Sequence, residues 1–170
     1  LPAKRILQKY LLKFSKHDYS FTRPNRRFFP KFYLPTSHSN CLIDLVIAVD
    51  SSYSVNDNDF LRFISESAGI LKNLQPETTT FIQFDFNIKS INKLRNTKDL
   101  LNISFTGRGG TNITPVIDWV NENKSQLLVV FTDGEFSFRK TGSTDTDTIW
   151  MIHNNPKFKP PWGKTIHYET

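Results

Sequence analysis

The stretch Ile43-Asp44-Leu45-Val46-Ile47-Ala48-Val49, followed directly by Asp50-Ser51-Ser52-Tyr53-Ser54, decides the fold of this chain. Residues 43–49 are mostly apolar and rich in β-branched side chains, which is typical of a strand covered on both faces in a parallel sheet. Ligands of open α/β sheets bind beyond the carboxyl ends of the strands. We therefore expect the side chains that follow this strand, those of Asp50, Ser52 and Ser54, to lie at a binding site.

Two other segments are expected at the same edge. Residues 126–132 form a second apolar strand pattern, which places Asp133 directly after it. The loop Gly107-Arg108-Gly109-Gly110 precedes Thr111, and its glycines allow close approach of the backbone. Alternate side chains of an extended turn can converge on one point. Because carboxylate and hydroxyl oxygens are the ligands that hard cations prefer, these segments predict a divalent metal site, most simply for Mg²⁺.

The remaining pattern is that of alternating strands and helices. Alternation of this kind predicts a three-layer α/β fold with a mainly parallel sheet flanked by helices. The other expected elements are an amphipathic helix at 4–14, an extended aromatic strap with prolines at 20–41, helices at 59–74 and 114–123, and strands at 79–88, 90–94, 148–153 and 165–168.

Length and hydropathy suit one α/β domain with an amino-terminal extension. The 170 residues are enough for a core without disulfides. We expect residues 41–170 to form the domain, and the basic helix and strap of residues 1–40 to pack on it. No run of about 18 or more apolar residues or amino-terminal signal pattern is present, so no membrane segment and a cytoplasmic location are expected.

The order D-x-S-x-S, then Thr after G-G, then Asp in T-D-G resembles the metal-ion-dependent adhesion site (MIDAS) of von Willebrand factor A (VWA) domains. More narrowly, the chain resembles the carboxy-terminal VWA-like domain of a family of proposed bacterial and phage metallopeptidases (DUF2201-like), often found with MoxR-type ATPases. Tyr53 stands where that family usually has Gly. The stretches that carry the resemblance are residues 18–27, 43–54, 107–111, 131–135 and 161–164.

The resemblance implies a Rossmann-like VWA fold and a defined set of ligands. Ser52, Ser54 and Thr111 would bind Mg²⁺ or Mn²⁺ directly, whereas Asp50 and Asp133 would act largely through water. The ion would then recruit an acidic side chain of a partner protein, and the family context implies an AAA ATPase of the MoxR type as one partner. A plainer interpretation exists for each residue, since Ser and Thr often cap helices and Asp is common in turns. All five residues in this order favour the metal site.

Catalytic interpretations fit less well, and no catalytic residue is predicted. A haloacid-dehalogenase-like phosphatase needs a second carboxylate two positions after Asp50, where this chain has Ser52. The zinc-peptidase pattern H-E-x-x-H is absent from these 170 residues. His153 and Asp44 are expected to be structural. Asp85 is open to two interpretations, because it can line the ligand edge or simply end a strand.

The positive charge is concentrated at the amino-terminal end. Residues 1–40 contain nine Lys and Arg and one acidic residue, a net charge of +8, so the rest of the chain carries −2 of the total of +6. This segment also contains interleaved aromatic residues, which can stack on bases. Binding of nucleic acid through residues 1–40 is therefore the alternative function, and a solvated helix face with core aromatics is the plainer explanation.

Overall fold

The computed structural model describes residues 17–24, 35–39, 44–136, 138 and 144–168. Its centre is a six-stranded sheet with the order β5-β4-β3-β6-β7-β8. All neighbours in this sheet are parallel except β4 and β5. The strands are β3 (Asp44–Asp50), β4 (Thr78–Phe84), β5 (Ile88–Leu94), β6 (Leu127–Thr132), β7 (Asp147–His153) and β8 (Lys164–Tyr168).

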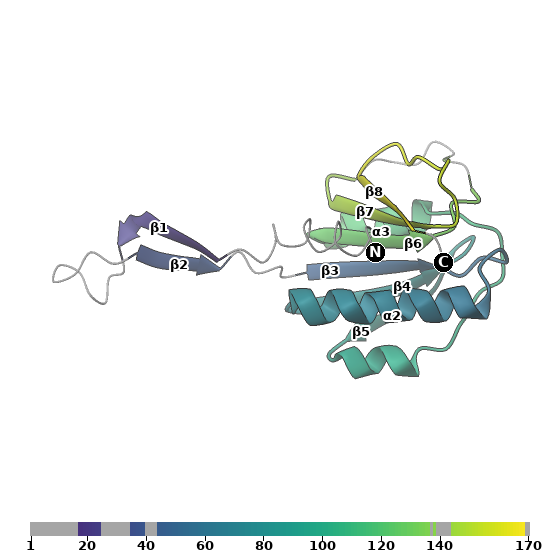
Figure 1. The fold of residues 1–170 in the computed structure, drawn as a ribbon, viewed down its shortest axis with the longest axis horizontal. Coiled ribbons are helices and arrows are strands. Elements are labelled where there is room, and N and C mark those ends of the chain that lie inside the picture. The colour runs from purple at the N-terminus through teal and green to yellow at the C-terminus, as the bar shows by residue number, and fades with distance from the viewer. Residues whose placement is uncertain (1–16, 25–34, 40–43, 137, 139–143, 169–170) are drawn as a thin grey trace.

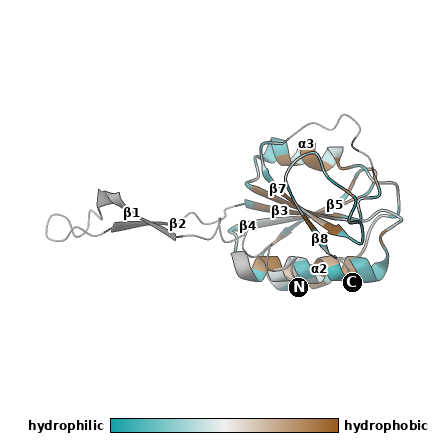
Figure 2. Ribbon diagram, turned by 45° about the horizontal axis from the view of Figure 1, so that its top comes forward, coloured by the Kyte–Doolittle hydropathy of each residue, from teal (hydrophilic) through white to brown (hydrophobic). Residues whose placement is uncertain are grey.

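Two helices, α2 (Asp57–Leu74) and α3 (Thr114–Asn123), cover opposite faces of the sheet (Figures 1 and 2). Side chains of β3 alternate between the two resulting cores. Leu45 and Ile47 pack in the core that contains residues of α2, whereas Val46 packs with residues of α3. Alternation along a strand that is apolar on both faces is what produces this arrangement. The predicted three-layer α/β fold is confirmed.

The helix boundaries follow from local chemistry. Asn56 caps α2 by accepting a hydrogen bond from the Asp59 N–H over 2.9 Å. Pro115 lies in the first turn of α3, where its missing N–H costs nothing. Among the described residues, no helix is both long and apolar enough to cross a membrane.

The strand predicted at residues 79–88 ends earlier than expected. β4 stops at Phe84 because Asp85 starts a tight turn, in which its N–H donates to the Asn87 carbonyl over 3.0 Å. A 3-10 helix, η1 (Thr97–Asn102), follows β5 and was not predicted. Asp99 stabilises its start by accepting hydrogen bonds from two preceding N–H groups, a contact that hydrophobic periodicity does not reveal.

The amino-terminal segment contains a second, two-stranded sheet. β1 (His17–Pro24) pairs antiparallel with β2 (Pro35–Ser39) (Figure 1). Residues 20–41 were expected to be extended, but their pairing into a hairpin was not predicted. Pro24 and Pro35 oppose each other at one end of the ladder, a position where a missing N–H is tolerated. The helix predicted at residues 4–14 lies outside the described residues, and the packing of residues 1–40 on the domain stays a prediction.

Candidate functional site

Asp50, the last residue of β3, is completely buried. Its two carboxylate oxygens have separate donors: the Ser52 N–H donates to Oδ1 over 2.9 Å, and the Thr132 hydroxyl donates to Oδ2 over 2.6 Å. Thr132 lies beside Asp50 because β3 and β6 are parallel neighbours, with Val49 opposite Phe131. One donor from its own turn and one from the next strand therefore fix this carboxylate.

Burial is the main influence on the acidity of Asp50, and it raises the pKa of the carboxyl group to about 6. Hydrogen bonds from Thr132 and Ser52 act in the opposite direction, and the negative charge of Asp133 adds to the rise. Nearby positive charge stabilises the ionised form of a buried carboxyl group. The protein itself thus leaves the charge of this carboxylate incompletely compensated.

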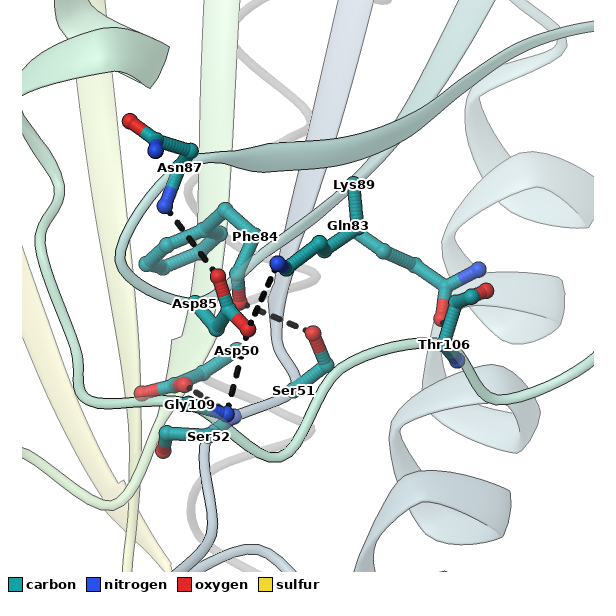
Figure 3. A network of polar contacts seen from close by, with 10 residues as sticks. All are labelled: Asp50, Ser51, Ser52, Gln83, Phe84, Asp85, Asn87, Lys89, Thr106 and Gly109. Atoms are coloured by element: carbon teal, nitrogen blue, oxygen red, sulfur yellow. Dashed lines mark hydrogen bonds and ion pairs between the residues drawn. The ribbon is translucent and has the colours of Figure 1, made fainter.

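Ser52 and Ser54 bring two hydroxyl groups together at the same edge. Their Oγ atoms are 3.1 Å apart, with Ser52 buried and Ser54 exposed. The Val55 N–H donates to the Ser52 carbonyl over 3.1 Å and closes the turn. Figure 3 shows Ser52 beside Asp50 at the end of the strand. The two serine hydroxyl groups, at alternate positions, therefore meet at the end of β3.

The segment after β6 forms the second side of the site. The Thr132 hydroxyl, which donates to Asp50, also accepts a hydrogen bond from the Gly134 N–H over 3.0 Å. The chain turns sharply here, with a φ of 71° at Gly134. Asp133 is half-buried, and its Oδ1 accepts from the Glu135 N–H over 3.0 Å. Its carboxylate is close enough for its charge to act on Asp50.

The glycine-rich loop lies directly against the turn after β3. A Cβ atom on Gly107 would be 2.3 Å from the Ser51 carbonyl oxygen, so no larger residue fits without movement of the backbone. The Tyr53 N–H donates to the Gly109 carbonyl over 3.0 Å. Thr111 follows this junction and is half-buried. The glycine-rich loop and the turn after β3 are therefore packed and hydrogen-bonded to each other.

Thr111 is the candidate that the structure joins least directly to the others. Among the described residues, its hydroxyl group makes no hydrogen bond to the other four candidates. The structure thus brings Asp50, Ser52 and Ser54 into contact, places Asp133 within electrostatic reach, and puts Thr111 on the adjoining loop.

Residues 45–169 match the family described as VWA-like domain (DUF2201). The chain belongs to this family of VWA-like domains. A solved structure, that of the conserved hypothetical protein BatB from Bacteroides thetaiotaomicron, is similar with a TM-score of 0.52 at 16% sequence identity. The match covers 65% of this chain and 66% of the BatB chain, and at this identity it shows a shared fold alone. No curated protein matches the chain.

The turn after β3 accommodates Tyr53, at the position where the resemblance led us to expect Gly. The side chain is 83% exposed, and the backbone does not adopt a positive φ. A glycine is therefore not required for the turn, since only the main-chain N–H of Tyr53 contributes to the junction with the loop.

The oxygen atoms at this edge of the VWA-like domain are of the kind that ligate a hard divalent cation. Hydroxyl oxygens of Ser52 and Ser54 lie at the same edge as the carboxylates of Asp50 and Asp133, and Mg²⁺ prefers oxygen ligands. In the described part of the chain, no group of three or more His, Cys, Asp and Glu side chains is placed to hold a metal ion. A metal at this edge would therefore depend on hydroxyl groups together with two carboxylates.

Thr132 gains a role at this edge that sequence analysis did not assign, and the structure bears on the two interpretations left open for Asp85. Thr132 belongs to the T-D-G motif, but only the register of β3 and β6 shows that its hydroxyl reaches Asp50. Asp85 directly follows β4, so it lies where the strand ends at the carboxyl edge of the sheet, and its side chain is 1% exposed. The sequence feature that could indicate this position of Asp85 is a carboxylate directly after an apolar strand pattern.

The two residues expected to be structural lie where the sequence placed them. His153 ends β7 and is buried, with Nε2 3.1 Å from Asp59 Oδ1. Its Nδ1 atom has no hydrogen-bond partner among the described residues. Asp44 is at the opposite end of β3 from Asp50 and accepts a hydrogen bond from the Thr78 hydroxyl over 2.8 Å.

Proposed function

We propose that this VWA-like domain is a protein-interaction module that binds Mg²⁺ or Mn²⁺ through Asp50, Ser52, Ser54, Thr111 and Asp133, and that it recruits an acidic side chain of a partner protein. The observation that supports it best is the buried Asp50, whose pKa is raised to about 6, beside a pair of hydroxyl groups. A carboxylate in this setting is stabilised by a cation at the same edge.

The position of the site in the sheet also supports the proposal. The chain leaves β3 towards β4 on one side and later returns to pair β6 on the other side. Ligands of open α/β sheets bind where the strand order changes direction in this way. Asp50 ends β3 and Asp133 follows β6, so the two carboxylates come from the adjoining ends of these two neighbouring strands.

The roles of the residues are those that the resemblance to VWA domains implies. Ser52, Ser54 and Thr111 would supply neutral oxygens to the ion, whereas Asp50 and Asp133 would hold its water ligands. Bound metal supplies a positive charge with an open coordination position for a carboxylate oxygen. Three neutral ligands leave much of that charge available to the partner. The proposal includes no catalytic role for this chain, and it names a MoxR-type AAA ATPase as a candidate partner.

Thermal unfolding in the presence of chelator and across titrations of Mg²⁺ and Mn²⁺ tests the metal site. A ligand that binds only the folded state raises stability by RT ln(1 + [L]/Kd), so the wild type should unfold at higher temperature as metal is added. Thr111→Ala should abolish the rise, because it removes one oxygen ligand while leaving the core intact.

Thr106→Ala is the matched control, since this exposed threonine lies on the same connection but its hydroxyl donates to the Ser104 carbonyl. It should keep the full response to metal. A wild type whose unfolding temperature does not change with either ion, or a Thr111→Ala variant that responds like wild type, would contradict the proposed site.

Nucleic-acid binding through residues 1–40 is the competing function, and its support is the charge of +8 on that segment. The effects of salt and of chelator on binding distinguish the two proposed functions. Contacts to phosphate weaken steeply as salt rises and survive removal of metal, whereas docking through a metal disappears with chelator. Retention of a 20-nucleotide single strand in chelator, lost at high salt, would favour this alternative.

A further inference from the structure

The carboxylate of Asp85 is buried under the glycine-rich loop and has three partners. Its Oδ1 accepts from the Asn87 N–H over 3.1 Å, and its Oδ2 accepts from the Gly109 N–H over 3.1 Å. The Lys89 ammonium group is 3.3 Å from the same Oδ2. Figure 3 shows this carboxylate between the end of β4 and the loop. Asp85 thus connects its own turn with a segment 24 positions away.

The main chain of Asp85 holds the same loop a second time. Its carbonyl oxygen accepts a hydrogen bond from the Asn112 N–H over 2.8 Å. Thr111 therefore lies between two residues, Gly109 and Asn112, that are both bound by Asp85. The fit at the first of them is tight, because a Cβ atom on Gly109 would be 2.7 Å from Oδ2 of Asp85.

The charge of Asp85 strengthens this attachment. Burial acts to raise the pKa of the carboxyl group, but hydrogen bonds from Asn87, Lys89 and Gly109 outweigh it, and the pKa falls below its ordinary value of 3.8. The group is therefore ionised at neutral pH. An ionised acceptor binds an N–H group roughly twice as strongly as a neutral one. The Lys89 side chain, 41% exposed, balances the buried charge from the solvent side.

We propose that Asp85 is the positioning residue of this metal site, which fixes residues 109–112 so that the Thr111 hydroxyl is presented to the ion. The inference rests on the function proposed above. It assigns Asp85 no contact with the metal, because the Lys89 ammonium group already balances its charge and both of its oxygens hold N–H groups of the turn and the loop. Its contribution is to remove the freedom of the loop before the ion binds.

Binding of Mn²⁺ to the purified chain, measured by electron paramagnetic resonance of the free ion, tests this role. Asp85→Asn keeps the shape of the side chain but turns one acceptor oxygen into a donor, which then faces an N–H group. Removal of groups that orient metal ligands typically costs about 10- to 100-fold in affinity, and a loss of this size is expected.

A double variant separates positioning from a general weakening of the fold. If Asp85 acts through Thr111, Asp85→Asn should change the affinity for Mn²⁺ little in a Thr111→Ala background, because the group being positioned is already gone. An equal loss in both backgrounds would overturn the proposal. So would an Asp85→Asn variant with the affinity of the wild type.

Asp99→Asn is the matched control. Asp99 also accepts hydrogen bonds from two N–H groups, those of Arg95 and Asn96, over 2.8 and 3.0 Å, but it serves η1. Its substitution should leave the affinity for Mn²⁺ unchanged. A loss equal to that of Asp85→Asn would show that any such carboxylate matters, and would overturn a specific role.

Gly109→Ala provides a second route if Asp85→Asn does not fold, as judged by circular dichroism. The added methyl group would meet Oδ2 of Asp85 and push the loop away from it, with the same expected loss of affinity. Full affinity in this variant would overturn the proposal. A wild type that binds no Mn²⁺ would overturn the proposed function and this inference together, whereas a wild type that binds alongside unaffected variants would overturn the inference alone.

Discussion

The two ends of β3 carry the same pair of residues in opposite surroundings. At the carboxyl end, the Thr132 hydroxyl of β6 donates to Asp50 over 2.6 Å, and both residues are completely buried. At the amino end, the Thr78 hydroxyl of β4 donates to Asp44 over 2.8 Å, with the threonine exposed and the aspartate half-buried. In both places a threonine of a parallel neighbour binds an aspartate of the central strand.

The difference shows that burial, more than residue type, decides what such a pair does. Water can complete the solvation of Asp44, so its pair with Thr78 is an ordinary surface contact. The side chain of Asp50 is completely buried, and burial raises the pKa of its carboxyl group to about 6. A nearby positive charge would therefore stabilise the ionised carboxylate at the carboxyl end of β3, whereas water already solvates the carboxylate at the amino end.

The largest effect that would test this comparison is a dependence of stability on pH in chelator. Folded protein keeps the proton of Asp50 up to a pKa of about 6, while an unfolded chain releases it near 3.8. The folded state binds more protons in this window, so the contribution of Asp50 to stability should fall as pH rises from 4 to 7. At about 1.4 kcal/mol per pKa unit, the loss reaches roughly 3 kcal/mol.

Urea unfolding of the wild type and of Asp50→Asn at both ends of this pH range measures that contribution by difference. As pH rises, the free energy of unfolding of Asp50→Asn should increase relative to that of the wild type. Added Mg²⁺ should raise the free energy of unfolding of the wild type at pH 7 but leave that of the variant unchanged. Asp44→Asn, at the opposite end of β3, should keep the stabilisation of the wild type by Mg²⁺. Parallel curves for the wild type and Asp50→Asn would show that burial does not distinguish the two ends.

A second test removes the hydroxyl group at each end. Thr132→Val leaves both Oδ2 of Asp50 and the Gly134 N–H without their partner, so the free energy of unfolding should fall by about 1–3 kcal/mol. Thr78→Val at the exposed end should stay within about 0.5 kcal/mol of the wild type. Chemical denaturation at pH 7 compares them, and equal losses would contradict the contrast.

The smallest expected effect concerns Tyr53, an exposed residue of the turn that follows the carboxyl end of β3. Tyr53→Gly should lower the free energy of unfolding by about 0.4–1 kcal/mol, because glycine gives the unfolded chain more freedom. Affinity for Mn²⁺ should not change, since the main-chain N–H that donates to Gly109 is retained. A tenfold or greater change in Mn²⁺ affinity would show that the exposed ring takes part in the site.

Sequence patterns predicted most of the domain because they depend on local periodicity. The helix at 114–123 and the strand at 148–153 were placed to within a residue, since apolar side chains recur there at helical or strand spacing. The edge at which Asp50 and Ser52 lie also followed from the sequence, because it requires only that a buried parallel strand ends before them.

What escaped prediction depends on which strands become neighbours. That Thr132 rather than another hydroxyl reaches Asp50 is set by the register between β3 and β6. The attachment of the glycine-rich loop to Asp85 is likewise a contact across 24 positions. No local pattern encodes such distances. The pairing of β1 with β2 was missed for the same reason, since extended backbone alone does not reveal its partner.

The hydrogen bond between Thr132 and Asp50 closes a segment of 82 residues. Contacts so distant along the chain carry the loop-closure entropy that slows folding, and we expect them to form after β3, α2 and β4 have docked. A cation at this edge would then stabilise only the completed molecule. Metal is therefore expected to slow unfolding while leaving the refolding rate nearly unchanged. The site would thus increase the kinetic stability of the folded protein.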